Sequence, residues 1–330
     1  MATKPTRKSA YPSLRSAMWL YCLVVLGTAA IVIPLAYSID VLVPRLMAAL
    51  VAVAGFTFVA VLVSRISPSA IFGRPPTSLS LVLSLLIGLA IWVPASWIRF
   101  TIYNWLNLAV GVLPPPLQST APPFSILLQA GAIIPLCHGF LFWAYIQRAA
   151  EALGRTRGVV LAAALYGIYG LFTAEGALSS VPEMFVVGLL AAFVVYYTDS
   201  AWAGILVLSG YGAARILLED VLFSFLGDQF IYPFSIRWLL IVAVTAFIAF
   251  ILFQAIRLRA SPQRETAEVP AAPKRLWWIP LAISTALFLV GAYGELALRL
   301  SARPNTPPVT TPRSGAPPVV IPPTATNPQR

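Results

Sequence analysis

Runs of about 20 apolar residues recur along the whole sequence, and they constrain the fold more than any other feature. Each run is long enough for a helix to cross the roughly 30 Å hydrocarbon core of a bilayer. Backbone polar groups cannot stay unpaired in lipid, so these runs must be helical, and the short alternating segments of a transmembrane barrel are not visible. With 59% hydrophobic and 10% charged residues, the sequence predicts an all-α polytopic integral membrane protein with about eight to nine transmembrane helices and no soluble domain.

The apolar runs and the polar stretches between them give the predicted organisation of the chain. Nine candidate spans lie at about 17–37, 46–64, 78–98, 124–147, 157–173, 181–198, 200–217, 236–256 and 276–298. The predicted regions are a basic N-terminus (1–16), membrane helices with an aromatic interfacial segment after residue 98 (17–123), a helical core (124–217), an interfacial loop with a further helix (218–256), a basic linker (257–275), a last membrane helix (276–298) and a disordered tail rich in Pro and Thr (299–330).

The net charge of +11 comes from basic residues that lie at the ends of the apolar runs. This placement is typical of topology signals and of contact with anionic lipid headgroups, so we expect membrane lipids as partners and no nucleic acid. With the N-terminus inside, the inner side holds fourteen of the 22 Lys and Arg: Lys4, Arg7, Lys8, Arg15, Arg65, Arg74, Arg148, Arg155, Arg157, Arg257, Arg259, Arg264, Lys274 and Arg275. We therefore expect a bacterial plasma-membrane protein with a cytoplasmic N-terminus and an outer C-terminus.

The stretch Gly131–Arg148 carries the only histidine of the sequence, His138, inside an otherwise apolar and aromatic run. A catalytic zinc site takes about three protein ligands, and neither a partner carboxylate nor a Cys/His zinc spacing is visible, so we predict no metal and no other cofactor. We favour a neutral imidazole that bonds a neighbouring helix, and the alternative is a remnant ligand or a proton-handling group. The YGIYG face at Tyr166–Gly170 is interpreted as helix packing, with a cavity lined by Tyr hydroxyls and His138 as the alternative.

Three stretches between about Gly131 and Gly212 follow one another in a recognisable order. They read FLFWAYIQRAAEALGRTRG (140–158), AAALYGIYGLF (162–172) and GLLAAFVVYYTDSAWAGILVLSGYG (188–212). Together they resemble the CPBP family of intramembrane proteases, which includes the CAAX-prenyl endopeptidases and the bacteriocin-processing (Abi) proteins. In that family a helix with EExxFRGxLQ and a basic turn precedes a Phe-x-x-x-His helix, a Tyr-Tyr-x-Thr-Gly-Ser-like turn and a helix with His-x-x-x-Asn or Asp. The resemblance implies a CPBP-like helical core.

The residues that carry the family's chemistry are changed in this sequence. Aligned on Phe142 and Gln147, the two glutamates fall at His138 and Gly139, and the arginine falls at Trp143. The histidine of the second motif falls at Gly170. In the last motif the histidine falls at Leu208 and the asparagine at Gly212.

An intramembrane hydrolase needs a carboxylate base and groups that position the attacking water, and the substitutions remove them. The resemblance therefore implies a catalytically inactive relative that binds or scaffolds another membrane protein or a hydrophobic or lipidated peptide. Three alternatives stay open. One is an active peptidase with a divergent site that uses His138 and an acid such as Glu175 or Glu183, another is a transporter, and the third is a structural subunit of a membrane complex.

Overall fold

The computed structural model describes residues 11–35, 42–111, 122–173, 177–227, 232–259 and 276–301. Within these ranges the chain is built from helices, and its one β-type contact is an isolated antiparallel bridge between Gly73 and Ser200. The predicted all-α fold is therefore confirmed. The predicted basic linker and tail lie mostly outside the described residues, as do residues 1–10 of the N-terminus.

The N-terminal half of the chain contains one very long helix and several shorter ones. Its elements are α1 (Leu14–Leu35), α2 (Leu42–Met47), the π-helical η1 (Ala48–Gly55), α3 (Phe56–Ser64), α4 (Pro68–Phe72) and α5 (Ser78–Ala109). The central segment consists of α6 (Pro123–Leu128), η2 (Gln129–Ile133), α7 (Ile134–Gly139), η3 (Phe140–Ile146), α8 (Gln147–Ala150) and η4 (Glu151–Leu153). The remaining elements are α9 (Arg155–Tyr169), η5 (Gly170–Phe172), α10 (Ser180–Thr198), α11 (Ala201–Leu226), α12 (Ile236–Arg259) and α13 (Ile279–Ser301).

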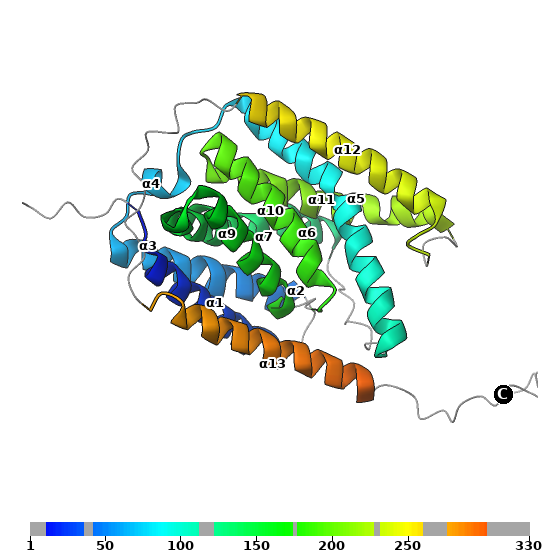
Figure 1. Ribbon diagram of the computed structural model, residues 1–330, viewed down its shortest axis with the longest axis horizontal. Helices are drawn as coiled ribbons and strands as arrows, with labels where there is room; N and C mark the ends of the chain where they lie inside the picture. Colours follow the sequence, from blue (N-terminus) through cyan, green and yellow to red (C-terminus); the bar gives the residue numbers. More distant parts are fainter. Residues whose placement is uncertain are drawn as a thin grey trace, which may run out of the picture.

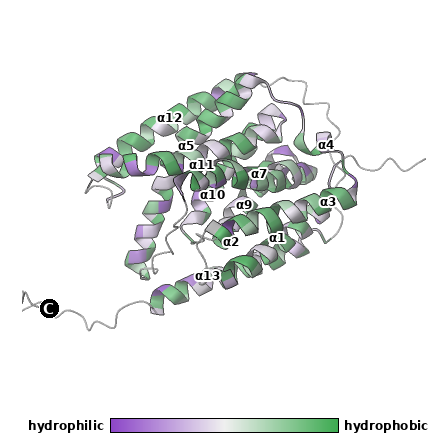
Figure 2. Cartoon of the chain, turned by 180° about the vertical axis from the view of Figure 1, so that it is seen from behind, coloured by the Kyte–Doolittle hydropathy of each residue, from purple (hydrophilic) through white to green (hydrophobic). Residues whose placement is uncertain are grey.

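In the part of the chain that the structure describes, eight helical stretches are long and apolar enough to cross a membrane, which confirms the polytopic prediction. They are Leu14–Val32, Val43–Ser64, Ser78–Ala109, Pro123–Leu153, Ser180–Thr198, Ala201–Leu226, Ile236–Arg259 and Ile279–Ser301. Hydrophobic residues cover most of their length in Figure 2. The count of nine was wrong at 157–173, because the helix there has only 15 residues. Such a helix is about 22 Å long, which is less than the bilayer core.

Two helices continue further along the sequence than predicted. The span that we ended at residue 98 continues as α5 to Ala109, so the aromatic segment after Arg99 is the last part of a 32-residue helix. Pro94 lies inside α5, and prolines are tolerated in membrane helices because neighbouring groups satisfy the freed carbonyl. The span that we ended at residue 217 likewise continues as α11 to Leu226.

The elements form a layered bundle. In Figure 1, α12 and the first part of α5 lie on one side, α1, α3 and α13 lie on the opposite side, and the segments from α6 to α11 lie between them. The turn from α10 to α11 meets the loop before α5, where Arg74 donates its backbone N–H to Asp199 O at 2.9 Å. We call this the basic end of the bundle, and we call the end where α13 meets the C-terminus of α5 the opposite end.

The last membrane helix is held to the body by a buried cation. The Arg299 side chain is fully buried; its Nη1 donates to Asn107 Oδ1 at 2.7 Å and to Gly111 O at 3.0 Å. Its Nη2 lies 2.8 Å from Glu295 Oε1, and Glu295 Oε2 accepts the Leu178 N–H at 2.6 Å. These contacts join α13 to the C-terminus of α5 and to the chain before α10, so α13 is an integral part of the bundle although a polar linker precedes it.

Two glycines make a very close contact between α5 and α11 in the core. A Cβ atom on Gly88 would overlap Val207 O, and a Cβ atom on Gly210 would overlap Leu85 O. Small residues of this kind let membrane helices approach until their backbones touch. The Gly88–Gly210 contact therefore fixes how α5 and α11 lie relative to each other.

We expect Gly88→Ala to destabilise the protein by at least about 2 kcal/mol, because the added methyl group meets rigid backbone rather than a movable side chain. The measurement is the unfolding midpoint of the purified protein in detergent micelles. Gly294→Ala is the matched control, since Gly294 also lies in a membrane helix but a Cβ atom there would meet nothing within 4 Å. The control should leave stability unchanged or raise it by up to about 1 kcal/mol. Equal midpoints for the two variants would contradict the assignment of the Gly88–Gly210 contact.

Candidate functional site

The stretch that carries His138 is one continuous helix with π-helical turns on both sides of the histidine. The Ile134 N–H donates to Gln129 O, and the Gln147 N–H donates to Phe142 O, a spacing of five residues in each case. Such turns are rare and occur often at functional sites. The predicted central helix therefore exists, and it presents His138 from the short α-helical piece α7 between the two π-helical pieces.

His138 lies against aromatic rings. Its side chain is buried, and its ring centroid lies 6.3 Å from Phe142, 5.8 Å from Tyr166 and 5.3 Å from Tyr169, each in an edge-on arrangement. The Tyr169 hydroxyl is in turn 3.1 Å from Thr28 Oγ1 on α1. Across the described ranges, no group of three or more His, Cys, Asp and Glu side chains could hold a metal ion. The surroundings of His138 thus resemble the packing of an aromatic core residue.

Gly139 and Trp143 are enclosed by neighbouring helices. A Cβ atom on Gly139 would overlap the Ile205 side chain of α11. Trp143 is completely buried, and Cβ atoms on Gly188 of α10 and Gly204 of α11 would lie 3.4 Å and 3.1 Å from its ring. At the three positions where the resemblance places two glutamates and an arginine, the space is therefore filled by interlocking apolar groups.

The other three motif positions also lie in helix contacts. A Cβ atom on Gly170 would lie 2.6 Å from Met184 Sδ of α10, and one on Gly212 would overlap Ala130 O of η2. Leu208 is a buried core residue of α11. The six motif positions thus lie within the packed core formed by the central helix, α9, η5, α10 and α11. Gly167, in the YGIYG face, likewise lies against Phe185 of α10, as the packing interpretation predicts.

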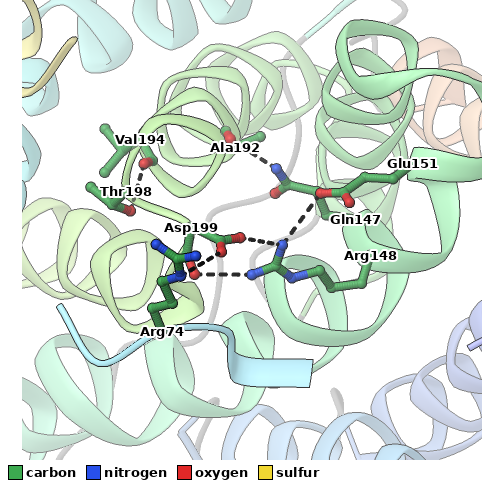
Figure 3. A network of polar contacts seen from close by, with 8 residues as sticks. All are labelled: Arg74, Gln147, Arg148, Glu151, Ala192, Val194, Thr198 and Asp199. Carbon is green, nitrogen blue, oxygen red and sulfur yellow. Dashed lines mark hydrogen bonds and ion pairs between the residues drawn. The ribbon is translucent and has the colours of Figure 1, made fainter. Parts of the chain in front are cut away.

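A network of polar contacts closes the basic end of this core (Figure 3). Arg148 of α8 donates from Nη1 to Asp199 Oδ1 at 2.7 Å and from Nη2 to Asp199 O at 3.0 Å. Glu151 Oε1 lies 3.4 Å from the same Nη1, and the exposed Arg74 lies 3.9 Å from Asp199 Oδ2. Gln147, which directly precedes Arg148, donates from Nε2 to Ala192 O of α10 at 2.9 Å. A buried guanidinium is thus paired and hydrogen-bonded, which removes most of the cost of placing it there.

The backbone around Asp199 is shaped for this network. Asp199 has a φ of 56°, a left-handed conformation that Asp tolerates better than most residues. Gly73 has a φ of +75°, and a Cβ atom there would overlap both Asp199 O and the Arg148 guanidinium. Glycine is therefore required at residue 73 for the loop before α5 to reach the turn between α10 and α11.

A second charged cluster lies within the membrane-spanning helices. The Tyr211 hydroxyl of α11 donates to Glu183 Oε1 of α10 at 2.6 Å, and Arg99 Nη1 of α5 lies 3.8 Å from Glu183 Oε2. Glu183 had been considered as an acid beside His138, but its partners here are Tyr211 and Arg99. Glu175, the other acid considered, lies outside the described residues.

Sequence reasoning missed both ionic clusters. The available signals were an aspartate directly after an apolar run at Asp199, an arginine directly after one at Arg148, and an acid early in a span at Glu183. None of these signals names the partner residue.

The chain was compared with protein-family models, with curated proteins and with solved structures, and nothing matches. The resemblance to the CPBP family therefore rests on the motifs of the sequence.

We expect Asp199→Asn to destabilise the protein by about 3 kcal/mol, because the Arg148 guanidinium would stay buried without its counter-ion. Asparagine also tolerates the left-handed backbone, so the substitution removes the charge without adding backbone strain. The measurement is the unfolding midpoint in detergent, with Asp220→Asn as a control. Asp220 is an exposed aspartate of α11, and its replacement should change stability by less than about 0.5 kcal/mol. Arg148→Gln should cost clearly less in the Asp199→Asn background than in the wild type; full additivity would contradict the pairing.

His138 should be replaceable by a ring of similar shape. We expect His138→Phe to change the free energy of unfolding by less than about 1.5 kcal/mol, because phenylalanine fills the same space among Phe142, Tyr166 and Tyr169. His138→Ala should cost roughly 2–4 kcal/mol, because it leaves a cavity. Unfolding midpoints of the two variants test this. If the Phe variant were as unstable as the Ala variant, the imidazole would have a polar role that packing does not explain.

Proposed function

We propose that this chain is a catalytically inactive membrane protein with a CPBP-like helical core that binds or scaffolds a hydrophobic or lipidated partner. The observation that carries the proposal is the closed packing at the six motif positions. Trp143 fills the space between Gly188 and Gly204, and His138 is surrounded by aromatic rings. A peptidase would need a carboxylate base and positioned ligands at these places.

The contacts of the remaining acid also favour a non-catalytic role. A divergent peptidase would need an acid that reaches His138 or a shared water. Glu183 instead accepts a short hydrogen bond from Tyr211 and lies beside Arg99. An acid held by these partners is not directed toward the histidine.

Two features support the CPBP-like frame. The stretches that most resemble the family, WAYIQR and VVYYTDSAW, meet in the structure through Arg148 and Asp199. The family turn has glycine where this sequence has Asp199, and Asp199 adopts the left-handed backbone that glycine favours. The turn thus has a backbone suited to the family pattern although the residue differs.

We also propose that the basic end faces the cytoplasm. In Figure 1 the starts of α1, α5 and α9 and the ends of α3 and α12 lie at this end, and the segments there carry Arg15, Arg65, Arg74, Arg155, Arg157, Arg257 and Arg259; Arg148 belongs to the network of Figure 3. The acids near Arg148, which are Glu151 and Asp199, are paired with it. Cytoplasmic loops of membrane proteins carry an excess of Lys and Arg, so this distribution favours the orientation expected from the sequence.

The proposal predicts binding without hydrolysis. The purified protein in phosphatidylcholine nanodiscs would be incubated with a fluorescent peptide that ends in a farnesylated cysteine, then separated by size exclusion. We expect the peptide to co-elute and to be recovered at its intact mass after prolonged incubation. His138→Phe should behave in the same way, because the ring has a packing role.

The same peptide without its farnesyl group is the matched control and should elute alone. Failure of the farnesylated peptide to bind would contradict the proposed class of partner. Release of a shorter peptide by the wild type, lost in His138→Ala, would support an active peptidase instead.

A further inference from the structure

Arg99, Glu183 and Tyr211 lie where α5, α10 and α11 meet inside the bundle. The close approach of α5 and α11 positions this cluster, because a Cβ atom on Gly88 would lie 2.8 Å from the Tyr211 backbone nitrogen. Tyr211 holds one carboxylate oxygen of Glu183 at 2.6 Å. Ionisable residues within membrane helices are rare, and they mark functional sites unless they are fully paired.

The ion pair in this cluster is looser than two other ion pairs among the described residues. Arg148 lies 2.7 Å from Asp199, and Arg299 lies 2.8 Å from Glu295. Arg99 lies 3.8 Å from Glu183, which exceeds the roughly 2.7–2.9 Å of a charge-assisted hydrogen bond. Among the described residues, no side-chain or backbone oxygen accepts a hydrogen bond from Arg99. Its guanidinium therefore carries five N–H donors without a strong acceptor.

The two charges also differ in how accessible they are. The Glu183 side chain is 3% exposed, whereas the Arg99 side chain is 25% exposed. The guanidinium thus lies between the buried carboxylate and the outer surface of the helices. N–H donors without an acceptor are costly in apolar surroundings, so a group from outside that offers oxygen atoms would be bound there.

The neighbourhood of Arg99 on the bundle is apolar and aromatic. Its guanidinium carbon lies 5.8 Å from the Phe100 ring centroid, and Phe100 packs against Phe223 and Trp238. A ligand that approaches Arg99 within the membrane therefore meets hydrophobic surface on its way.

We propose that Arg99 binds the anionic head of an amphiphile from the membrane, a phosphate or carboxylate group whose tail lies along this apolar surface. The guanidinium would donate to two oxygens of the anion at once, as it does with carboxylates and phosphates in general. Glu183, held by Tyr211, positions Arg99 and weakens the binding by its own negative charge. This site is independent of the proposed binding of a lipidated partner at the central core.

The opposite effects of the two charges provide the test. Wild-type protein in phosphatidylcholine nanodiscs would be titrated with phosphatidylglycerol, or with oleate, and bound molecules would be counted by native mass spectrometry. Arg99→Gln should weaken binding at least about tenfold, because it removes a charge-assisted pair of hydrogen bonds. Glu183→Gln should strengthen binding by about threefold or more, because it removes a repulsive charge and can keep the bond from Tyr211. Arg99→Lys should lie between wild type and Arg99→Gln, because it keeps the charge but loses the planar fork.

Arg237→Gln is the matched control, because Arg237 is an exposed arginine at the start of α12 and also makes only a long 3.4 Å contact, with Phe225 O. Unfolding midpoints in pure phosphatidylcholine show which variants are folded. Equal binding by Arg99→Gln and Arg237→Gln would overturn the site. Weaker binding by both Arg99→Gln and Glu183→Gln would also overturn it, since that is the result for a purely structural ion pair. Binding of inorganic phosphate or acetate as tight as that of the amphiphiles would overturn the membrane source of the ligand.

Discussion

The ion pair between Arg148 and Asp199 is the contact on which the arrangement of the core depends. It joins the helix that carries His138 to the turn between α10 and α11, and Arg74 in the loop before α5 donates its backbone N–H to the same turn. A guanidinium that is almost completely buried must find acceptors or pay a desolvation cost of several kcal/mol. Arg148 finds both the carboxylate and the backbone oxygen of one residue. This double contact allows little freedom in the relative position of α8 and α10.

The residues at the motif positions of the core fit closely against their neighbours, which fill the space that the polar side chains of the family pattern would need. Trp143 needs the absence of side chains at Gly188 and Gly204, and Gly139 makes room for Ile205. Each substitution relative to the family pattern is thus matched by its neighbours. Placing an arginine at residue 143 would bury an unpaired charge and leave part of the indole volume empty, and both effects destabilise. The core is therefore a self-consistent packing arrangement, and one replacement alone would not fit a charged motif residue into it.

The sequence predicted the parts of the fold that local hydrophobicity determines. Eight of the nine predicted spans correspond to helices that are long enough to cross a membrane. The error at 157–173 arose because an apolar run does not reveal the Gly154 turn, with its φ of 102°, or the tight 3-10 turn that begins at Gly170. The predicted end of α5 was too early because aromatic residues suggested an interface, although neither Pro nor Gly occurs between Arg99 and Gly111.

The ionic clusters could not be predicted in the same way. Arg148 and Asp199 lie 51 positions apart, and Tyr211 and Glu183 lie 28 positions apart. Hydrophobic periodicity assigns a residue to a helix but does not say which helices touch. His138 illustrates the same limit, because its isolation in the sequence indicated chemistry, whereas the rings that surround it come partly from α9. The composition of a membrane helix predicts its existence well, and the partners of its few polar groups depend on the tertiary arrangement.

Three ionic groups among the described residues can be compared, namely those of Arg148, Arg299 and Arg99. A buried ion pair adds little net stability over an apolar pair, so its main effect is to exclude arrangements that leave a charge unpaired. Arg148 at the basic end and Arg299 at the opposite end meet this condition with short contacts, and each joins segments that are distant in the sequence. Arg99 does not meet it, although Gly88 and Gly210 hold its surroundings rigidly. If imprecise packing caused the long Arg99–Glu183 distance, the adjacent 2.6 Å bond from Tyr211 to Glu183 would also be long. The long distance therefore reflects the position of the Arg99 side chain alone, and Arg99 is also the exposed member of the cluster.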